Sequence, residues 1–214
     1  MTLVVDAARP DADVIARAAD LLRQGGVLAY PTDTLYGLAA DPASQRAVEE
    51  LYRIKGRQVD QAIPLIAADF AQVERCAGQL SHAAHRLGTC LWPGPLTLIV
   101  PAWAGLAAAL HGGTGTVAIR VPAHPVACAL ARAFGAPIPS TSANRSGQPA
   151  TSSPDVVRAS MGNDLVAILD AGRSPGGLPS TIVDVLGERP RLVRPGAVPF
   201  ERVLECVQQP PHAV

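Results

Sequence analysis

The chain has 214 residues, of which 48% are hydrophobic, 17% charged and 4% aromatic. A chain of this size fits one domain, or at most two small ones, and needs neither a disulfide nor a metal to fold. The composition is too apolar for a disordered chain, so aliphatic side chains must supply the packing. The 18 basic and 18 acidic residues cancel, which excludes the protein-wide basic field typical of nucleic-acid binding.

The N-terminus lacks the basic start and the apolar run of a signal peptide. No apolar stretch reaches the ~18 residues that a membrane span needs. We therefore expect a cytoplasmic protein without a membrane segment.

The cysteines and histidines do not have the spacing of a metal site. His82 and His85 are three residues apart without a third ligand nearby, and we expect both on a helix surface. No C-x-x-C pair occurs, which argues against a zinc site or a disulfide framework and favours reduced, buried thiols. The four cysteines are Cys76, Cys90, Cys128 and Cys206.

Helical and strand patterns alternate along the chain. The first helix shows apolar residues at helical spacing and stops at Gly25-Gly26, a glycine C-cap. Ser153, Pro154 and Asp155 predict another helix start, with Ser153 as the N-cap. Helices are predicted over residues 11–24, 43–54, 81–91, 125–134, from 153 onwards and over 200–207. Strands are predicted over residues 27–30, 63–67, 96–100, 116–121, 166–169, 180–185 and 191–193.

Several of these strands are joined by connections too short for a parallel crossover, which predicts a mixed sheet. No internal repeat or low-complexity linker interrupts the pattern. We therefore expect a single α/β domain over residues 1–207, followed by a frayed tail over residues 208–214.

Polar loops held by glycine and proline punctuate these elements, and α/β folds place their ligand groups in such loops. Four cations are candidates for binding one polyanion or carboxylate: Lys55, Arg57, Arg120 and Arg194. Lys55 is the only lysine in the chain. Arg120 lies in an apolar strand and therefore needs a partner, either a substrate carboxylate or a structural carboxylate such as Asp33 or Asp184.

Thr116, Ser142 and Asn144 add neutral hydrogen-bonding groups, and the whole set fits a nucleoside triphosphate together with a small carboxylate. Neither a Walker motif nor a G-x-G-x-x-G motif is present. Residues 172–176 match the hydrolase pattern G-x-S-x-G, but Pro175 follows Ser174 and has no N–H for an oxyanion hole. A hydrolase is therefore excluded on chemical grounds.

In chain order the loops resemble the YrdC/TsaC family of threonylcarbamoyl-AMP synthases, over about residues 12 to 205. The segments that carry this resemblance are Tyr30–Leu38, Lys55–Arg57, Trp92–Thr97, Val117–Pro122, Ser140–Asn144, Ser180–Asp184 and Arg194–Gly196.

The resemblance implies a short, single-domain form with a twisted mixed sheet flanked by helices around a deep basic cavity. The implied reaction joins L-threonine, bicarbonate or CO2 and ATP into threonylcarbamoyl-AMP and pyrophosphate, with Mg²⁺ assisting. The product would pass to a separate complex that modifies a tRNA adenosine, and direct tRNA binding would be weak.

The resemblance also implies roles for individual residues. Lys55 and Arg57 correspond to catalytic cations, and no residue is assigned as a metal ligand. The ATP-binding positions correspond to Lys55, Arg57, Thr116, Ser142, Asn144 and Arg194. The threonine-binding positions correspond to Thr34, Arg120, Ser140 and Ser180.

The segment Gln58–Leu65 departs from the family pattern, because Gln58 stands where many relatives have proline. Two other functions stay open. One is an RNA-binding module of the same fold without synthase activity. The other is an enzyme that forms carbamoyl-adenylate from carbamoyl phosphate, although this chain lacks the additional segments of those larger relatives.

Overall fold

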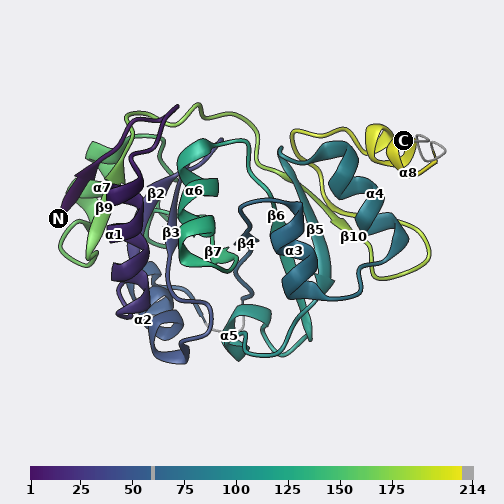
Figure 1. Ribbon diagram of the computed structural model, residues 1–214, viewed down its shortest axis with the longest axis horizontal. Coiled ribbons are helices and arrows are strands. Elements are labelled where there is room, and N and C mark those ends of the chain that lie inside the picture. The colour runs from purple at the N-terminus through teal and green to yellow at the C-terminus, as the bar shows by residue number, and fades with distance from the viewer. Residues whose placement is uncertain (59–60, 209–214) are drawn as a thin grey trace.

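The computed structural model describes residues 1–58 and 61–208 and is built on two mixed sheets (Figure 1). The first sheet has the order β1-β9-β2-β3-β8 and the second the order β11-β10-β5-β6-β4-β7. The strands are β1 (Thr2–Val4), β2 (Leu28–Pro31), β3 (Tyr36–Ala39), β4 (Leu65–Ile66), β5 (Leu96–Pro101), β6 (Thr116–Arg120), β7 (Ile138–Pro139), β8 (Thr141–Ser142), β9 (Ala167–Asp170), β10 (Thr181–Asp184) and β11 (Arg191–Arg194).

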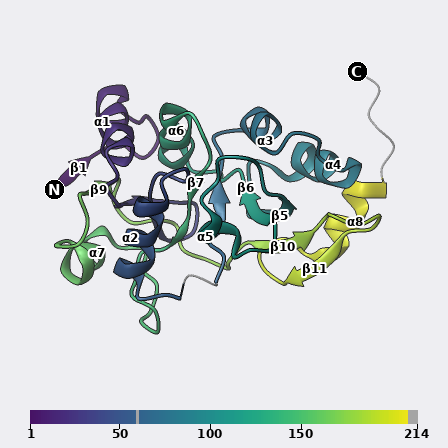
Figure 2. The same ribbon diagram turned by 90° about the horizontal axis from the view of Figure 1, so that it is seen from below.

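Helices α1, α6, α3 and α4 form a row along one side of the strands (Figure 2). α1 and α6 pack against each other beside the first sheet, and α4 packs against α8 at the C-terminal end of the molecule. The helices are α1 (Ala12–Arg23), α2 (Gln45–Lys55), α3 (Phe70–Ala77), α4 (His82–Leu91), α5 (Ala108–His111), α6 (Pro125–Phe134), α7 (Pro154–Met161) and α8 (Phe200–Gln208).

Both sheets combine parallel and antiparallel neighbours. In the first sheet β2 pairs antiparallel with β3 and parallel with β9. In the second, β5 pairs antiparallel with β6 and parallel with β10. The predicted α/β class with mixed pairing is confirmed, and the strands are divided between two sheets.

Helix boundaries follow the capping chemistry of the sequence. The Asp11 carboxylate accepts the backbone N–H groups of Asp13 and Val14 at the start of α1. α2 ends at Gly56, which adopts the left-handed conformation (φ 63°) that favours glycine. The predicted N-cap at Ser153 is confirmed, with Pro154 in the first turn of α7, although the Ser153 side chain makes no capping hydrogen bond.

Six elements were not predicted from the sequence: β1, β3, α3, α5, β7 and β8. Most of them have only two to four residues, too few to show a period. At the other end of the chain, α8 extends to Gln208, the first residue of the segment expected to fray. Residues 209–214 lie outside the described part of the chain.

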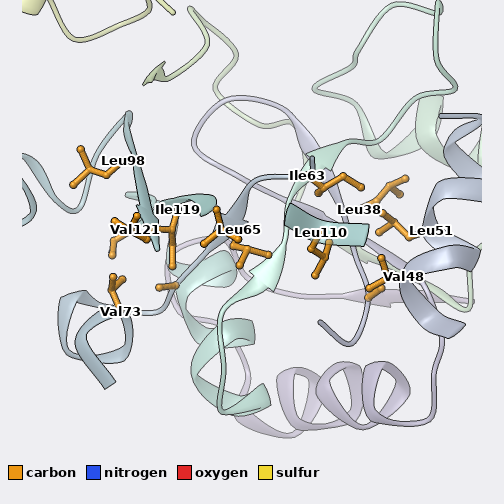
Figure 3. Close-up of a cluster of buried hydrophobic side chains, with 14 of the residues drawn as sticks. Leu38, Val48, Leu51, Ile63, Leu65, Val73, Leu98, Leu110, Ile119 and Val121 are labelled. Atoms are coloured by element: carbon orange, nitrogen blue, oxygen red, sulfur yellow. The ribbon is translucent and has the colours of Figure 1, made fainter. Parts of the chain in front are cut away.

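A continuous aliphatic core joins the two sheets (Figure 3). Leu38 and Leu51 belong to this core beside the first sheet, and Leu98 and Ile119 belong to it beside the second. Leu65 lies between them in Figure 3 and is fully buried. Because one core supports both sheets, their relative position is fixed by packing.

His82 and His85 lie on the exposed surface of α4, as predicted. His85 Nε2 is 3.4 Å from a carboxylate oxygen of Glu74. Within residues 1–58 and 61–208, no group of three or more His, Cys, Asp or Glu side chains could hold a metal ion. In the same part of the chain, no helix is both long enough and apolar enough to cross a lipid bilayer.

The expectation of four reduced cysteines is wrong for one pair. Cys90 on α4 and Cys206 on α8 form a disulfide with a Cα–Cα distance of 6.2 Å. The packing of α8 on α4 brings the two together across 116 residues of chain, a proximity that local spacing cannot reveal. Cys76 and Cys128 are free, in agreement with the expectation.

Reduction of the Cys90–Cys206 disulfide should lower the free energy of unfolding by about 2–4 kcal/mol, because the bond restricts the unfolded chain over a long loop. Urea denaturation with and without a reductant measures the difference. The Cys90→Ser variant should give the same stability in both conditions, whereas Cys76→Ser, which alters a free thiol, should keep the full response. A wild-type chain that is indifferent to the reductant would contradict the bond.

Candidate functional site

A cavity of about 650 Å³ lies between the two sheets, and both sheets contribute to its walls. We call it the inter-sheet cavity. Seven of the ten predicted site residues line it: Thr34, Arg57, Arg120, Ser140, Ser142, Ser180 and Arg194. Its lining within the described residues contains no carboxylate, so the three arginines dominate its charge.

Strand alternation explains how β6 serves both the core and the cavity. Val117 and Ile119 point into the aliphatic core. Ala118 and Arg120 line the inter-sheet cavity on the opposite face. Thr116 has the same parity as Arg120, four residues away at the other end of the strand, and shares a hydrogen bond of 3.0 Å with Thr114. Thr116 is therefore on the cavity face of the strand but outside the cavity lining.

Lys55, the last residue of α2, is buried against the loop that follows β8. Its ammonium donates hydrogen bonds to the Ser142 carbonyl (2.5 Å), the Ser142 hydroxyl (3.0 Å) and Asn144 Oδ1 (2.7 Å). Burial, together with the nearby Arg57 guanidinium, lowers the pKa of Lys55 to about 8. Lys55 thus holds Ser142 in the wall of the cavity while its own side chain stays behind that wall.

Asn144 follows Ser142 by two residues and lines a neighbouring cavity of about 510 Å³. Its amide nitrogen donates to the carbonyls of Arg145 (3.0 Å) and Gln148 (2.6 Å). The three predicted site residues outside the inter-sheet cavity therefore differ. Lys55 and Asn144 are bonded to its wall, and Thr116 continues one of its strands.

Arg57 directly follows the left-handed Gly56 and turns into the inter-sheet cavity. Its Nη2 donates to the Ala62 carbonyl at 3.0 Å, which ties it to the segment that departs from the family pattern. Arg57 Nε is buried and has no hydrogen-bond partner among the described residues. Part of the guanidinium is therefore held by the protein, and one donor is left unsatisfied.

Arg194 approaches the cavity from the edge strand β11. Its Nη2 donates to the Ser180 carbonyl (2.7 Å) and lies 3.2 Å from the Ser180 hydroxyl. Partial burial and, to a smaller extent, the positive charge of Arg120 lower the pKa of Arg194. At the following turn, a β-carbon on Gly196 would overlap the backbone of Pro179 and Ser180. The absence of a side chain at this glycine lets the turn lie directly against the Ser180 segment.

Thr97 is a polar residue of the site for which the sequence suggested no role. It lies on β5, is 2% exposed, and its hydroxyl is 2.8 Å from that of Ser180. The sequence feature that could have identified Thr97 is that it is the single hydroxyl residue in the apolar run Leu96–Val100. Strand alternation places it on the face opposite Leu96 and Leu98.

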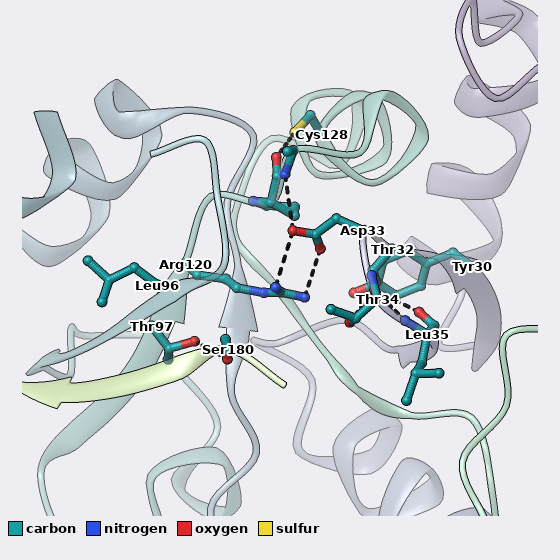
Figure 4. A network of polar contacts seen from close by, with 12 residues as sticks. Tyr30, Thr32, Asp33, Thr34, Leu35, Leu96, Thr97, Arg120, Cys128 and Ser180 are labelled. Atoms are coloured by element: carbon teal, nitrogen blue, oxygen red, sulfur yellow. Dashed lines mark hydrogen bonds and ion pairs between the residues drawn. The ribbon is translucent and has the colours of Figure 1, made fainter. Parts of the chain in front are cut away.

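Arg120 finds its protein partner in Asp33, in the loop between β2 and β3 (Figure 4). The two Nη atoms of Arg120 lie 3.1 and 3.4 Å from the two carboxylate oxygens of Asp33. Asp184, the other carboxylate considered, pairs instead with Arg191 at 2.8 Å. Because Arg120 still lines the cavity, the ion pair and a contact with a substrate carboxylate are compatible.

The G-x-S-x-G segment shows no catalytic geometry. Ser174 is 6% exposed, and its hydroxyl has no hydrogen-bond partner in the part of the chain that the structure describes. Its backbone N–H donates to the Ser152 carbonyl at 2.9 Å. Ser174 is therefore a buried loop residue, in agreement with the exclusion of a hydrolase.

Sequence comparison finds relatives over most of the chain. A chain from Pyrococcus abyssi named threonylcarbamoyl-AMP synthase is 36% identical over 190 residues, which cover 89% of this chain and 56% of that relative. A chain from Mycobacterium tuberculosis named putative threonylcarbamoyl-AMP synthase is 36% identical over 209 residues, covering 97% and 96%. The present chain thus spans little more than half of the first relative and nearly all of the second.

Among solved structures, that of P. abyssi Sua5 complexed with L-threonine matches with a TM-score of 0.90 and 34% identity, covering 97% of this chain and 61% of that one. The family model of Sua5, YciO and YrdC, described as telomere recombination, matches residues 20–196. On these matches the chain belongs to the Sua5/YciO/YrdC family.

Proposed function

We propose that the chain is an L-threonylcarbamoyl-AMP synthase, a nucleotidyltransferase that makes threonylcarbamoyl-AMP and pyrophosphate from L-threonine, bicarbonate or CO2, and ATP. The observation that carries this proposal is the inter-sheet cavity, where three arginines and six hydroxyl side chains from the two sheets and their loops meet. Family membership and the names of the relatives support it.

For the nucleotide, we assign Arg57 and Arg194 as the cations of the inter-sheet cavity that face the triphosphate. Both guanidinium groups line the cavity, and a triphosphate needs several cations for charge compensation. Lys55 contributes its positive charge from behind the wall and fixes Ser142 and Asn144. Thr116, at the start of β6 and on the strand face that carries Arg120, completes the proposed ATP-binding set.

For threonine, a recess of about 100 Å³ adjoins the inter-sheet cavity. It shares Thr34, Arg120 and Ser140 with the larger cavity. Arg120 offers a bidentate partner for the amino-acid carboxylate, and the hydroxyl groups of Thr34, Ser140 and Ser180 offer hydrogen bonds. The L-threonine complex of P. abyssi Sua5 supports an amino-acid site in this fold.

The reaction requires positioning more than a dedicated base. The neutral threonine amine forms an N–C bond with CO2 and releases a proton, which gives a carbamate. A carbamate oxygen then bonds to the α-phosphorus of ATP while the bond to pyrophosphate breaks. Lys55 and Arg57 are the catalytic cations in this proposal, because they would offset the charge that develops on the departing pyrophosphate.

Mg²⁺ enters this scheme as part of the ATP substrate. Since no carboxylate lines the inter-sheet cavity among the described residues, phosphate oxygens rather than protein side chains would bind the ion. The product would then serve a tRNA-modifying transferase complex in the cytoplasm. The protein's balanced charge agrees with weak tRNA contact.

The decisive experiment measures pyrophosphate release from MgATP and bicarbonate with threonine, with serine or without an amino acid. We expect release that depends on threonine and exceeds that with serine, because a pocket that fits the β-methyl group gains about 1–3 kcal/mol. Release that requires carbamoyl phosphate instead would identify a carbamoyl-adenylate enzyme. Salt-dependent RNA binding without ATP consumption would identify an RNA-binding module. Either result would refute the proposed synthase.

The Arg57→Ala variant should slow threonine-dependent pyrophosphate release at least tenfold, because a charge-assisted contact is worth about 1.5–3 kcal/mol. Arg53→Ala is the matched control: Arg53 lies four residues earlier on α2, is exposed and pairs with Glu50 at 2.6 Å. The control should keep wild-type activity, and thermal unfolding should show both variants folded. Equal activity in the two variants would remove Arg57 from the site.

The affinity for ATP should fall as pH rises through 8, because Lys55 loses its proton and its charge there. Below that pH the ammonium is charged and attracts the triphosphate. We expect the Kd for ATP, measured without threonine, to rise severalfold between pH 7 and 9.5, because the neutral amine no longer attracts the triphosphate through the cavity wall and holds Ser142 and Asn144 less firmly. The Lys55→Met variant should bind more weakly with a flat profile over that range. The same rise in the variant would show that another group titrates.

A further inference from the structure

Asp33 stands behind Arg120 and does not itself reach the inter-sheet cavity. Arg120 lines the cavity, whereas Asp33 is absent from its lining and from that of the adjoining recess. The Asp33 side chain is 14% exposed, and its Oδ1 atom is fully buried. A ligand in the cavity can therefore experience Asp33 only through the arginine.

Groups from both sheets hold Asp33 in place: the Thr32 hydroxyl holds its backbone turn, and the Ala123 N–H contacts its carboxylate (Figure 4). On the side of the first sheet, the Thr32 hydroxyl closes the turn that carries Asp33: it donates to the Leu35 carbonyl (2.7 Å) and accepts the Thr34 N–H (3.2 Å). On the side of the second sheet, the Ala123 N–H, 3.4 Å from Asp33 Oδ2, points to the same carboxylate as Arg120. Asp33 thus connects a loop of the first sheet with the end of β6 in the second.

The ion pair leaves part of the guanidinium available. Asp33 faces the two Nη atoms of Arg120, and a guanidinium has five N–H donors. The remaining donors can bind a second carboxylate on the side of the cavity. With Asp33 at one edge, the plane of the guanidinium is set before the substrate arrives, so less conformational freedom is lost on binding.

Asp33 also moderates the repulsion between the cations of the site. Partial burial is the main cause of the lowered pKa of Arg194, and the positive charge of Arg120 adds to it. Besides Arg194, three titratable groups interact electrostatically with the pair, and these three are uncharged near neutral pH. Burial raises the pKa of Tyr30, raises that of Cys128 to about 11 and lowers that of His124. Among these neighbours, Asp33 therefore supplies the negative charge that keeps Arg120 in place.

We propose that Asp33 is a positioning residue for the amino-acid substrate: it holds the Arg120 guanidinium in the orientation that receives the threonine carboxylate. This inference rests on the proposed function and adds to it a residue that the motif resemblance did not assign. It assigns no chemistry to Asp33 and predicts that its whole effect passes through Arg120.

The first test is threonine binding by calorimetry, which needs no turnover. The Asp33→Asn variant keeps the size of the side chain and removes its charge. We expect its Kd for threonine to rise about tenfold, the effect of losing one charge-assisted contact, while its Kd for ATP changes less than about twofold. In steady-state assays the same split should appear as a raised KM for threonine with a nearly unchanged KM for ATP.

Asp184→Asn is the matched control. Like Asp33, Asp184 is mostly buried, accepts one backbone N–H (Leu186, 2.9 Å) and pairs with one arginine, Arg191. Arg191 does not line the inter-sheet cavity. This control should bind threonine as the wild type does. An equal loss in both aspartate variants would reduce the role of Asp33 to general stability and overturn the inference.

A double-mutant cycle tests whether Asp33 acts through Arg120. Arg120→Lys alone should weaken threonine binding, and adding Asp33→Asn to it should weaken binding no further. Losses that simply multiply would overturn the inference, as would an unchanged Kd in Asp33→Asn. If Asp33→Asn fails to fold, Asp33→Glu replaces it in the cycle, because it keeps the charge and displaces it by one methylene group.

The outcome for Asp33 can be separated from the outcome for the proposed function. A wild-type chain that binds threonine but releases no pyrophosphate would refute the synthase activity and leave the binding cycle fully interpretable. If the wild-type chain makes threonylcarbamoyl-AMP but the Asp33→Asn variant binds threonine with unchanged affinity, the synthase activity is supported and the role of Asp33 is refuted.

Discussion

The candidate site depends on a single buried ammonium group. Lys55 is 4% exposed, and its three donors are matched by three oxygen acceptors on Ser142 and Asn144. Burying an ammonium is costly unless each donor has a partner, so the position of the lysine and the path of the loop after β8 determine each other. α2, which ends at Gly56, delivers the ammonium to that loop and then releases the chain so that Arg57 can turn into the cavity. One helix end thus organises two sides of the site.

The inter-sheet cavity arises where strand alternation in the second sheet meets the loops of the first. The residues of β6 show the principle: Val117 and Ile119 contribute to the core, while Arg120 points the other way and reaches Asp33 across the sheets. The side chains that line the cavity are therefore supported by an aliphatic core on the far face of the same strands. This arrangement holds the polar groups on rigid elements, as a preorganised site requires.

The sequence predicted most of the long elements, and seven of the ten predicted site residues line one cavity; the failures have identifiable causes. α1 and α6 carry a full amphipathic period with clear end signals, whereas β7 and β8 have two residues each and no period to detect. Glycine and proline marked the loops of Lys55, Arg57 and Arg194, whereas Arg120 stood out as a charge in an otherwise apolar strand. The choice of Asp33 over Asp184 as the partner of Arg120 was left open, as it depends on which loop crosses between the sheets. The Cys90–Cys206 contact similarly depends on how α8 docks.

The turn at Gly196 limits which amino-acid substitutions the end of β11 can tolerate. A β-carbon at this position would overlap the Pro179–Ser180 backbone. Every replacement must therefore displace the end of β11, and with it Arg194, from its contact with Ser180. Leu192, only a few residues earlier, is exposed and imposes no such demand. Tolerance to substitution therefore changes abruptly within one short strand. The backbone after its end has no room for a side chain, whereas an exposed position within the strand, such as Leu192, does.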